Sequence, residues 1–122
     1  MIAWTMRILA AAGLLGSAWV HWVVWADFMR DIAVVGPLFL VNVVAGVVIA
    51  IAVLAWHHWL PALAAIGFGL ATLGAYVLSV TVGFFDVQER FTTQAEVWGV
   101  ITEAACVVFG IALLVARPGR RA

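Results

Sequence analysis

Residues 93–116 read TQAEVWGVITEAACVVFGIALLVA, an apolar run that carries two carboxylates, Glu96 and Glu103. At 1.5 Å per residue, a helix over this run is long enough to cross a bilayer. The two acids lie on one stripe of that helix, because residues seven apart return to nearly the same face. The same stripe carries Gly99, Cys106 and Gly110. Lipid cannot solvate an ionised carboxylate, so we expect this stripe to face other helices.

The composition of the chain is that of an integral membrane protein. Of its 122 residues, 67% are hydrophobic and 10% are charged, and the mean hydropathy is +1.20. Soluble domains are about one quarter charged. The six basic residues, all arginine, are balanced by six acidic ones, so no positive field is available to bind nucleic acid. We therefore expect a multi-pass protein of the cell membrane, with the lipid bilayer as a partner and no nucleic acid.

The apolar runs are separated by short polar or proline-containing connections. They predict helices over about residues 4–25, 37–57, 61–82 and 94–116, in one integral membrane domain that covers residues 1–122. Proline is tolerated in a first helical turn, so Pro37 marks the start of the second helix. The predicted fold class is all-α, a bundle of four antiparallel transmembrane helices.

The distribution of arginine predicts the orientation in the membrane. Arg7 and the three arginines of residues 117–121 lie on one side of an even number of helices. The connections at 27–31 and 86–90 lie on the other side, and each holds one arginine and two acids. Positive residues favour the cytoplasm. Both termini are therefore expected to be cytoplasmic, and the two acidic connections to lie outside.

Each expected helix has one face of small and polar residues spaced at three and four positions, and these faces reach similar depths. Glu103 lies deepest, about 13 Å from the outer end of its helix at 1.5 Å per residue. The resulting hypothesis is a polar pocket that is open to the outside and binds a ligand or protons. Its lining residues would be Glu103, His21, Asn42, Tyr76, Ser79 and Glu96.

Structural roles are also open to most of these residues. Glu96 has the capping-box spacing with Thr93, in which its carboxylate would satisfy free N–H groups at the helix start. Asn42 can serve as a hydrogen-bonding contact between helices. His21 lies near the outer boundary among tryptophans, where an interfacial role is equally reasonable. Ser79 can bond back to a carbonyl of its own helix.

Glu103 differs from the others because no helix end is near it. Its carboxyl group must be protonated or paired with a polar side chain such as His21, Asn42 or Tyr76. An ionisable group inside a membrane span is read as functional unless a structural partner is found.

The sequence predicts no catalytic residue, no cofactor and no metal ion. His57 and His58 are adjacent, which directs their side chains about 100° apart and makes them poor ligands for one ion. His21 lies at the opposite surface, so a transmembrane haem with two histidine ligands is not expected. A metal held by His21, Glu96 and Glu103 stays open, although nothing in the spacing identifies one. No motif for phosphate binding or nucleophilic catalysis is present, so we do not expect an enzyme.

Three classes of function remain. The first is a non-catalytic accessory or self-associating module that forms a homo-oligomer or joins a larger membrane complex, for which Gly67, Ala71 and Gly74 would provide an outward face. The second is a small proton-coupled transporter or ligand-binding membrane protein that uses Glu103. The third is a redox or quinone-associated subunit in which His21 and tryptophans bound an aromatic ligand. We rank the module first, because a transporter commonly shows broken helices or a full set of paired polar groups. A filled core would favour the module further, whereas a cavity that reaches Glu103 from outside would favour the second class.

Overall fold

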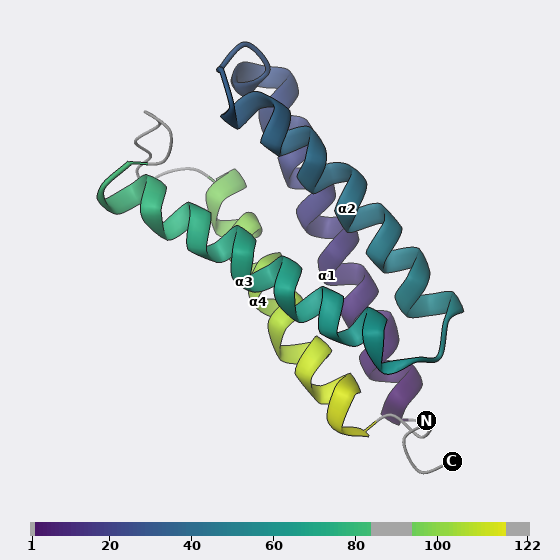
Figure 1. The fold of residues 1–122 in the computed structure, drawn as a ribbon. Coiled ribbons are helices and arrows are strands. Elements are labelled where there is room, and N and C mark those ends of the chain that lie inside the picture. Colours follow the sequence, from purple (N-terminus) through teal and green to yellow (C-terminus); the bar gives the residue numbers. More distant parts are fainter. Residues whose placement is uncertain (1, 84–93, 117–122) are drawn as a thin grey trace.

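The computed structural model describes residues 2–83 and 94–116, which form an antiparallel bundle of four helices. The elements are α1 (Ile2–Val24), a π-helical turn η1 (Trp25–Met29), α2 (Val35–Ala55), α3 (Trp59–Thr81) and α4 (Gln94–Ala116). The all-α prediction is confirmed, and all four helices are long and apolar enough to cross a membrane. The start of α1, the end of α4 and the α2–α3 connection lie at the same end of the bundle (Figure 1). Which end faces the cytoplasm stays a prediction.

Helices α2 and α3 each begin two residues before the predicted start, so that their prolines, Pro37 and Pro61, lie inside the first turn. The first N–H groups of a helix have no partner within it, so a proline there removes no hydrogen bond. At the start of α3, His58 acts as the N-cap, because its Nδ1 accepts a hydrogen bond from the backbone N–H of Leu60 at 3.1 Å.

The first helix continues further than predicted. After α1, the N–H of Arg30 donates to the carbonyl of Trp25 at 3.0 Å, the spacing of a π-helical turn. The chain then reverses at Val34, whose φ of 69° and ψ of −58° form a γ-turn closed by a 2.8 Å bond from Val35 N to Ala33 O. The α1–α2 connection is short. It is also strained, because a positive φ is unfavourable for a β-branched residue such as Val34.

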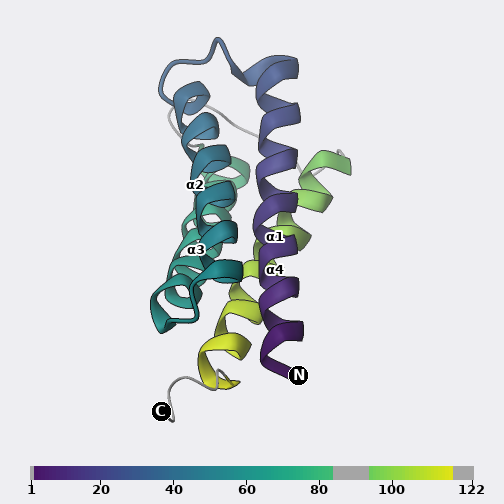
Figure 2. The same cartoon turned by 90° about the vertical axis from the view of Figure 1, so that its right-hand side faces the viewer.

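Helix α1 packs against both α2 and α4, and α3 packs against α4, whereas α2 and α3 contact each other less extensively. Figure 1 shows that α2 and α3 diverge from their connection, whereas in the turned view of Figure 2 the two helices overlap. Glycine allows the closest approaches, since a Cβ on Gly69 would lie 2.8 Å from the carbonyl oxygen of Glu103. The predicted inward stripe of α4 is confirmed, because its described members are all buried: Gly99, Glu103, Cys106 and Gly110.

A small apolar cluster around Val24 and Val35 lies near the α1–α2 connection, but the larger apolar core fills only the opposite half of the bundle. We call this the closed half, the end that holds the start of α1 and the α2–α3 connection. Its buried residues include Ala10, Leu14, Val53, Ala65 and Leu113. The other half, which we call the open half, contains the second part of α1, the first part of α2 and the second part of α3, and it encloses a cavity.

Candidate functional site

A cavity of about 350 Å³ lies between all four helices in the open half. Its wall is mainly aliphatic and aromatic, and its most exposed side chains include Leu38 and Val41 of α2, which are 40% and 61% exposed. The polar side chains that line it, among the described residues, are His21, Asn42, Thr72, Tyr76, Ser79 and Glu103. The cavity therefore combines a lipophilic wall with a few polar groups.

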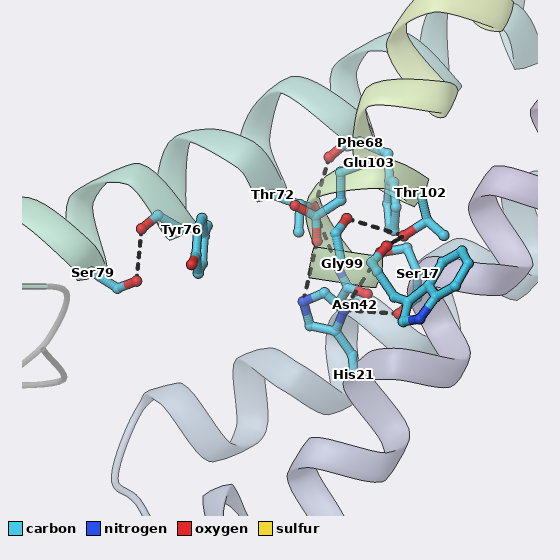
Figure 3. Close-up of polar contacts among 11 residues, drawn as sticks. Ser17, His21, Asn42, Phe68, Thr72, Tyr76, Ser79, Gly99, Thr102 and Glu103 are labelled. Carbon is cyan, nitrogen blue, oxygen red and sulfur yellow. Dashed lines mark hydrogen bonds and ion pairs between the residues drawn. The ribbon is translucent and has the colours of Figure 1, made fainter. Parts of the chain in front are cut away.

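Figure 3 shows that the polar side chains fall into two places, with His21, Asn42, Thr72 and Glu103 gathered near the crossing of the helices. Tyr76 and Ser79 lie further along α3 (Figure 3), where the Ser79 hydroxyl donates to the carbonyl of Tyr76 at 2.7 Å. That bond to its own helix is the structural alternative anticipated for Ser79. Both residues line the cavity at a distance from the carboxylate.

Helices α1 and α4 bring His21 and Glu103 together. His21 Nε2 lies 3.8 Å from Glu103 Oε2, and Glu103 is only 3% exposed. Ser17 lies one turn before His21 on the same inward face of α1, and its carbonyl oxygen lies 2.8 Å from His21 Nδ1. The histidine ring is therefore held on one side by its own helix and directed towards α4 on the other.

The hydrogen bond to Ser17 determines which ring nitrogen of His21 carries a proton. A carbonyl oxygen can only accept, so Nδ1 must be the donor. In a neutral ring Nε2 is then an acceptor, and it faces a carboxylate oxygen of Glu103, which is also an acceptor when ionised. Two facing acceptors repel unless one further proton resides on the ring or on the carboxyl group. Contact between these two atoms is therefore favourable only when the ring or the carboxyl group carries a proton in addition to the one on Nδ1.

A second polar chain links α2 to α3. Asn42 Nδ2 donates to Thr72 Oγ1 at 3.0 Å, and Thr72 Oγ1 donates to the carbonyl of Phe68 at 2.7 Å. This is the interhelical contact anticipated for asparagine. The remaining amide oxygen, Asn42 Oδ1, is buried and accepts no hydrogen bond from residues 2–83 or 94–116. The wall thus offers an acceptor that a ligand can use.

The sixth predicted site residue, Glu96, belongs to α4, but its side chain is outside the described residues, as is Thr93. The capping-box alternative for these two residues therefore stays a prediction. The binding role of the other five residues also stays a prediction, although all five line one cavity.

Sequence reasoning treated Arg7 only as a marker of orientation, and the structure buries it within the closed half at 4% exposed. Its Nη1 donates to the carbonyl of Val53 in the last turn of α2 at 2.7 Å, and its guanidinium carbon lies 5.5 Å from the centre of the Trp4 ring. The spacing contained the signal, since Arg7, Leu14 and His21 are seven residues apart and share the inward face of α1.

The described residues contain no group of three histidine, cysteine, aspartate or glutamate side chains placed to hold a metal ion. His57 and His58 lie at the closed end, where their rings pack against Trp4 at 5.2 Å and Trp56 at 4.8 Å. These histidines are therefore far from the cavity and act as part of an aromatic cluster.

Comparison of the chain with models of known protein families, with curated proteins and with solved structures gives no match.

Proposed function

We propose that this chain is a small integral membrane protein that binds a lipophilic molecule in the cavity of the open half. The polar group of the ligand would contact the His21–Glu103 pair. The observation that carries the proposal is a cavity of about 350 Å³ with a buried carboxylate in its wall. Binding pockets for small molecules commonly measure about 300–1,000 Å³ and combine an apolar lining with a few polar groups.

The contrast between the two halves of the bundle supports binding. Protein interiors are close-packed and contain few voids larger than a water molecule. The closed half is close-packed in this sense, because the side chains of Leu14, Val53 and Leu113 are at most 1% exposed. A filled open half would have favoured the non-catalytic module, whereas an unfilled one supports a ligand site.

The rim of the cavity supports a lipophilic ligand. Leu38 and Val41 are exposed apolar residues of α2, and both lie within a segment apolar enough to cross a membrane. The exposed side of the cavity thus belongs to a lipid-compatible surface where α2 and α3 diverge. A molecule dissolved in the bilayer can reach such a rim directly, without crossing a polar surface.

A cavity-filling variant tests the proposal. Ala75 lines the cavity on α3, so Ala75→Phe would place a ring in it. We expect 3-phenylpropan-1-ol, a neutral probe, to bind the protein saturably in lipid nanodiscs, measured by equilibrium dialysis against empty nanodiscs. We expect Ala75→Phe to weaken this binding at least tenfold without lowering the melting temperature, because the added ring occupies existing space.

The matched control is Ala55→Phe, the same substitution at an exposed position at the end of α2, which should bind the probe like the unmodified protein. Uptake no greater than that of empty nanodiscs would overturn the proposal. Equal binding by Ala75→Phe would do the same.

Self-association is a second candidate, and one observation on α3 favours it. A Cβ added at Gly67 or Gly74 would meet nothing within 4 Å, and these glycines are seven residues apart on one face. Small residues on a lipid-facing surface let two helices approach closely. We expect Gly67→Leu with Gly74→Leu to lower energy transfer between labelled copies in bilayers, whereas Val108→Leu on the exposed face of α4 should not. Absence of energy transfer in the unmodified protein would exclude this candidate.

A further inference from the structure

We propose that the cavity selects lipophilic molecules whose polar group donates a hydrogen bond, and that Asn42 is the residue that makes this selection. The ligand would carry a neutral hydroxyl or N–H group rather than an ether oxygen or no polar group. This inference rests on the proposed function and deepens it, because it specifies the chemistry of the polar group. It follows from the hydrogen bonds of Asn42 and Thr72 and from the apolar wall around them.

The hydrogen bonds of Thr72 fix the orientation of the Asn42 amide. Thr72 has one hydroxyl proton, which its Oγ1 donates to the carbonyl of Phe68 at 2.7 Å. Towards Asn42 the same oxygen can therefore only accept, so the amide atom 3.0 Å from it must be the nitrogen, Nδ2. The exchanged orientation would place two acceptors face to face. The amide oxygen, Oδ1, is therefore the atom turned away from Thr72.

Asn42 Oδ1 is a buried acceptor that receives no hydrogen bond within the part of the chain that the structure describes. Buried polar atoms are satisfied in nearly all folded proteins, because an unpaired one loses its hydration without compensation. Asn42 also lines the cavity. A molecule bound there can supply the missing donor.

The helices around Asn42 can adjust to admit that donor. Helices α2 and α3 contact each other less extensively than α3 and α4 do, and Figure 1 shows them diverging from their connection. A small separation of α2 from α3 would therefore turn Oδ1 towards the cavity without breaking a large packed interface.

The apolar wall makes the ligand the source of the hydrogen bond. All other residues of α2 that line the cavity are apolar: Val35, Leu38, Phe39, Val41 and Ala45. A lipophilic body that packs against these side chains excludes water from the space beside Asn42. A ligand without a donor would then leave Oδ1 unpaired in a dry site. Sites of this kind discriminate strongly against analogues that lack the hydrogen-bonding group.

The same polar group can also contact the His21–Glu103 pair. Figure 3 shows His21, Asn42, Thr72 and Glu103 gathered at one place. A hydroxyl that donates to Asn42 keeps two lone pairs with which it can accept. A hydroxyl therefore suits both sides of the site, whereas an ether oxygen can only accept.

The experiment compares 3-phenylpropan-1-ol with 1-fluoro-3-phenylpropane on the full chain in lipid nanodiscs. Fluorine replaces the hydroxyl group in the second probe, so the two have similar shapes and only the alcohol can donate. Equilibrium dialysis gives both affinities, each expressed relative to the probe dissolved in empty nanodiscs so that different solubility in lipid cancels. We expect the unmodified protein to bind the alcohol at least tenfold more tightly than the fluoride.

Two variants separate the acceptor from the contact between the helices. Asn42→Leu removes Oδ1 together with the bond to Thr72. It should abolish the preference for the alcohol and bind the fluoride as tightly as the unmodified protein does, which also reports that the fold is intact. Thr72→Val removes the same bond but keeps Oδ1, so it should retain the preference. Variants are needed because His21 and Glu103 line the same cavity and can also contact a hydroxyl.

A preference for the alcohol that Asn42→Leu retains would overturn selection by Asn42. Loss of the preference in Thr72→Val as well would assign the effect to the contact between the helices and overturn it too. Equal affinity of the unmodified protein for the two probes would overturn the proposal without any variant, so the test holds even if Asn42→Leu does not fold. Failure of the unmodified protein to bind either probe would instead contradict the proposed function itself.

Discussion

Arg7 and Glu103 are both ionisable and both buried, and the structure accommodates them in different ways. Arg7 donates to the carbonyl of Val53 at the end of α2, where the last carbonyls of a helix have no partner of their own. Glu103 lies opposite His21 beside a cavity. The arginine thus stabilises contact between α1 and α2, whereas the carboxyl group lies where a ligand can reach it.

The first prediction at this scale concerns the role of Arg7. The variant Arg7→Met keeps a long unbranched side chain, now uncharged, but leaves the carbonyl of Val53 without this hydrogen-bond donor. We expect the free energy of unfolding in detergent to fall by about 1–3 kcal/mol, the cost of a buried group that loses its partner. Arg30→Met, at an exposed arginine, should change it by less than about 0.5 kcal/mol. Equal effects of the two variants would exclude a stabilising role for the buried hydrogen bond.

The second prediction concerns the strained backbone of Val34, whose φ is 69°. Glycine adopts positive φ without steric cost, and the chain already uses it at Gly83, where φ is 93°. Relief of strain should outweigh the extra entropy of glycine in the unfolded chain, so Val34→Gly should raise the unfolding free energy by about 1 kcal/mol. Val34→Ala retains a Cβ and should give no gain. A lower stability of Val34→Gly in thermal unfolding would show that the turn is not strained.

At the scale of elements, glycines determine how closely α3 approaches its neighbours. A Cβ on Gly69 would lie 2.7 Å from Val107 Cγ2 and 2.8 Å from the carbonyl oxygen of Glu103, whereas one on Gly67 would meet nothing within 4 Å. Two glycines of the same helix therefore have opposite roles. One positions the cavity wall against α4, and the other leaves a small exposed surface.

This difference gives a matched pair of variants. Gly69→Ala must push α3 away from α4, and we expect it to destabilise the fold by about 1–3 kcal/mol, as overpacking does. Gly67→Ala should be neutral or stabilising by up to about 1 kcal/mol, because alanine favours helix over glycine. Unfolding in detergent measures both. If Gly69→Ala is tolerated as well as Gly67→Ala, α3 and α4 are not in the close contact described.

At the scale of the whole molecule, the bundle has a packed half and an open half. The closed half holds the apolar core, the buried Arg7 and the cluster of tryptophans with His57 and His58. The open half holds the cavity and the His21–Glu103 pair. Such a division gives one part of the fold the stability and leaves the other part available for binding.

The orientation of the molecule is a prediction at this scale. The basic residues of 117–121 favour a cytoplasmic closed half. In a Cys106→Ala background, Asp31→Cys should react with a membrane-impermeant maleimide added to intact cells, and His57→Cys should react only after the cells are opened. Both positions are exposed, so the protein itself would not shield either cysteine from the reagent. The reverse labelling pattern would place the open half towards the cytoplasm.

The sequence by itself determined the four helices and the inward stripe of α4. Length, hydropathy and the helical repeat are local properties, so they can be read from each segment alone. Lipid does not solvate a carboxylate, so an acidic residue within a span must lie on the face that contacts other helices. Helices α2 and α3 begin only two residues before the starts predicted from Pro37 and Pro61. The first turn of a helix tolerates proline at its third position as well as at its first. The same helical repeat, applied to the spacing of Arg7 and His21, would have predicted that Arg7 is buried between helices.

Only the tertiary structure decided which polar side chains meet. The sequence placed His21, Asn42, Tyr76 and Ser79 at similar depths, but their partners depend on how each helix is rotated and how closely it approaches its neighbours. The structure pairs His21 with Glu103 and Asn42 with Thr72, and leaves Tyr76 and Ser79 further along α3. It also decided that one half is filled and the other encloses a cavity, because α2 and α3 diverge, and divergence is a property of packing between helices that no single segment encodes.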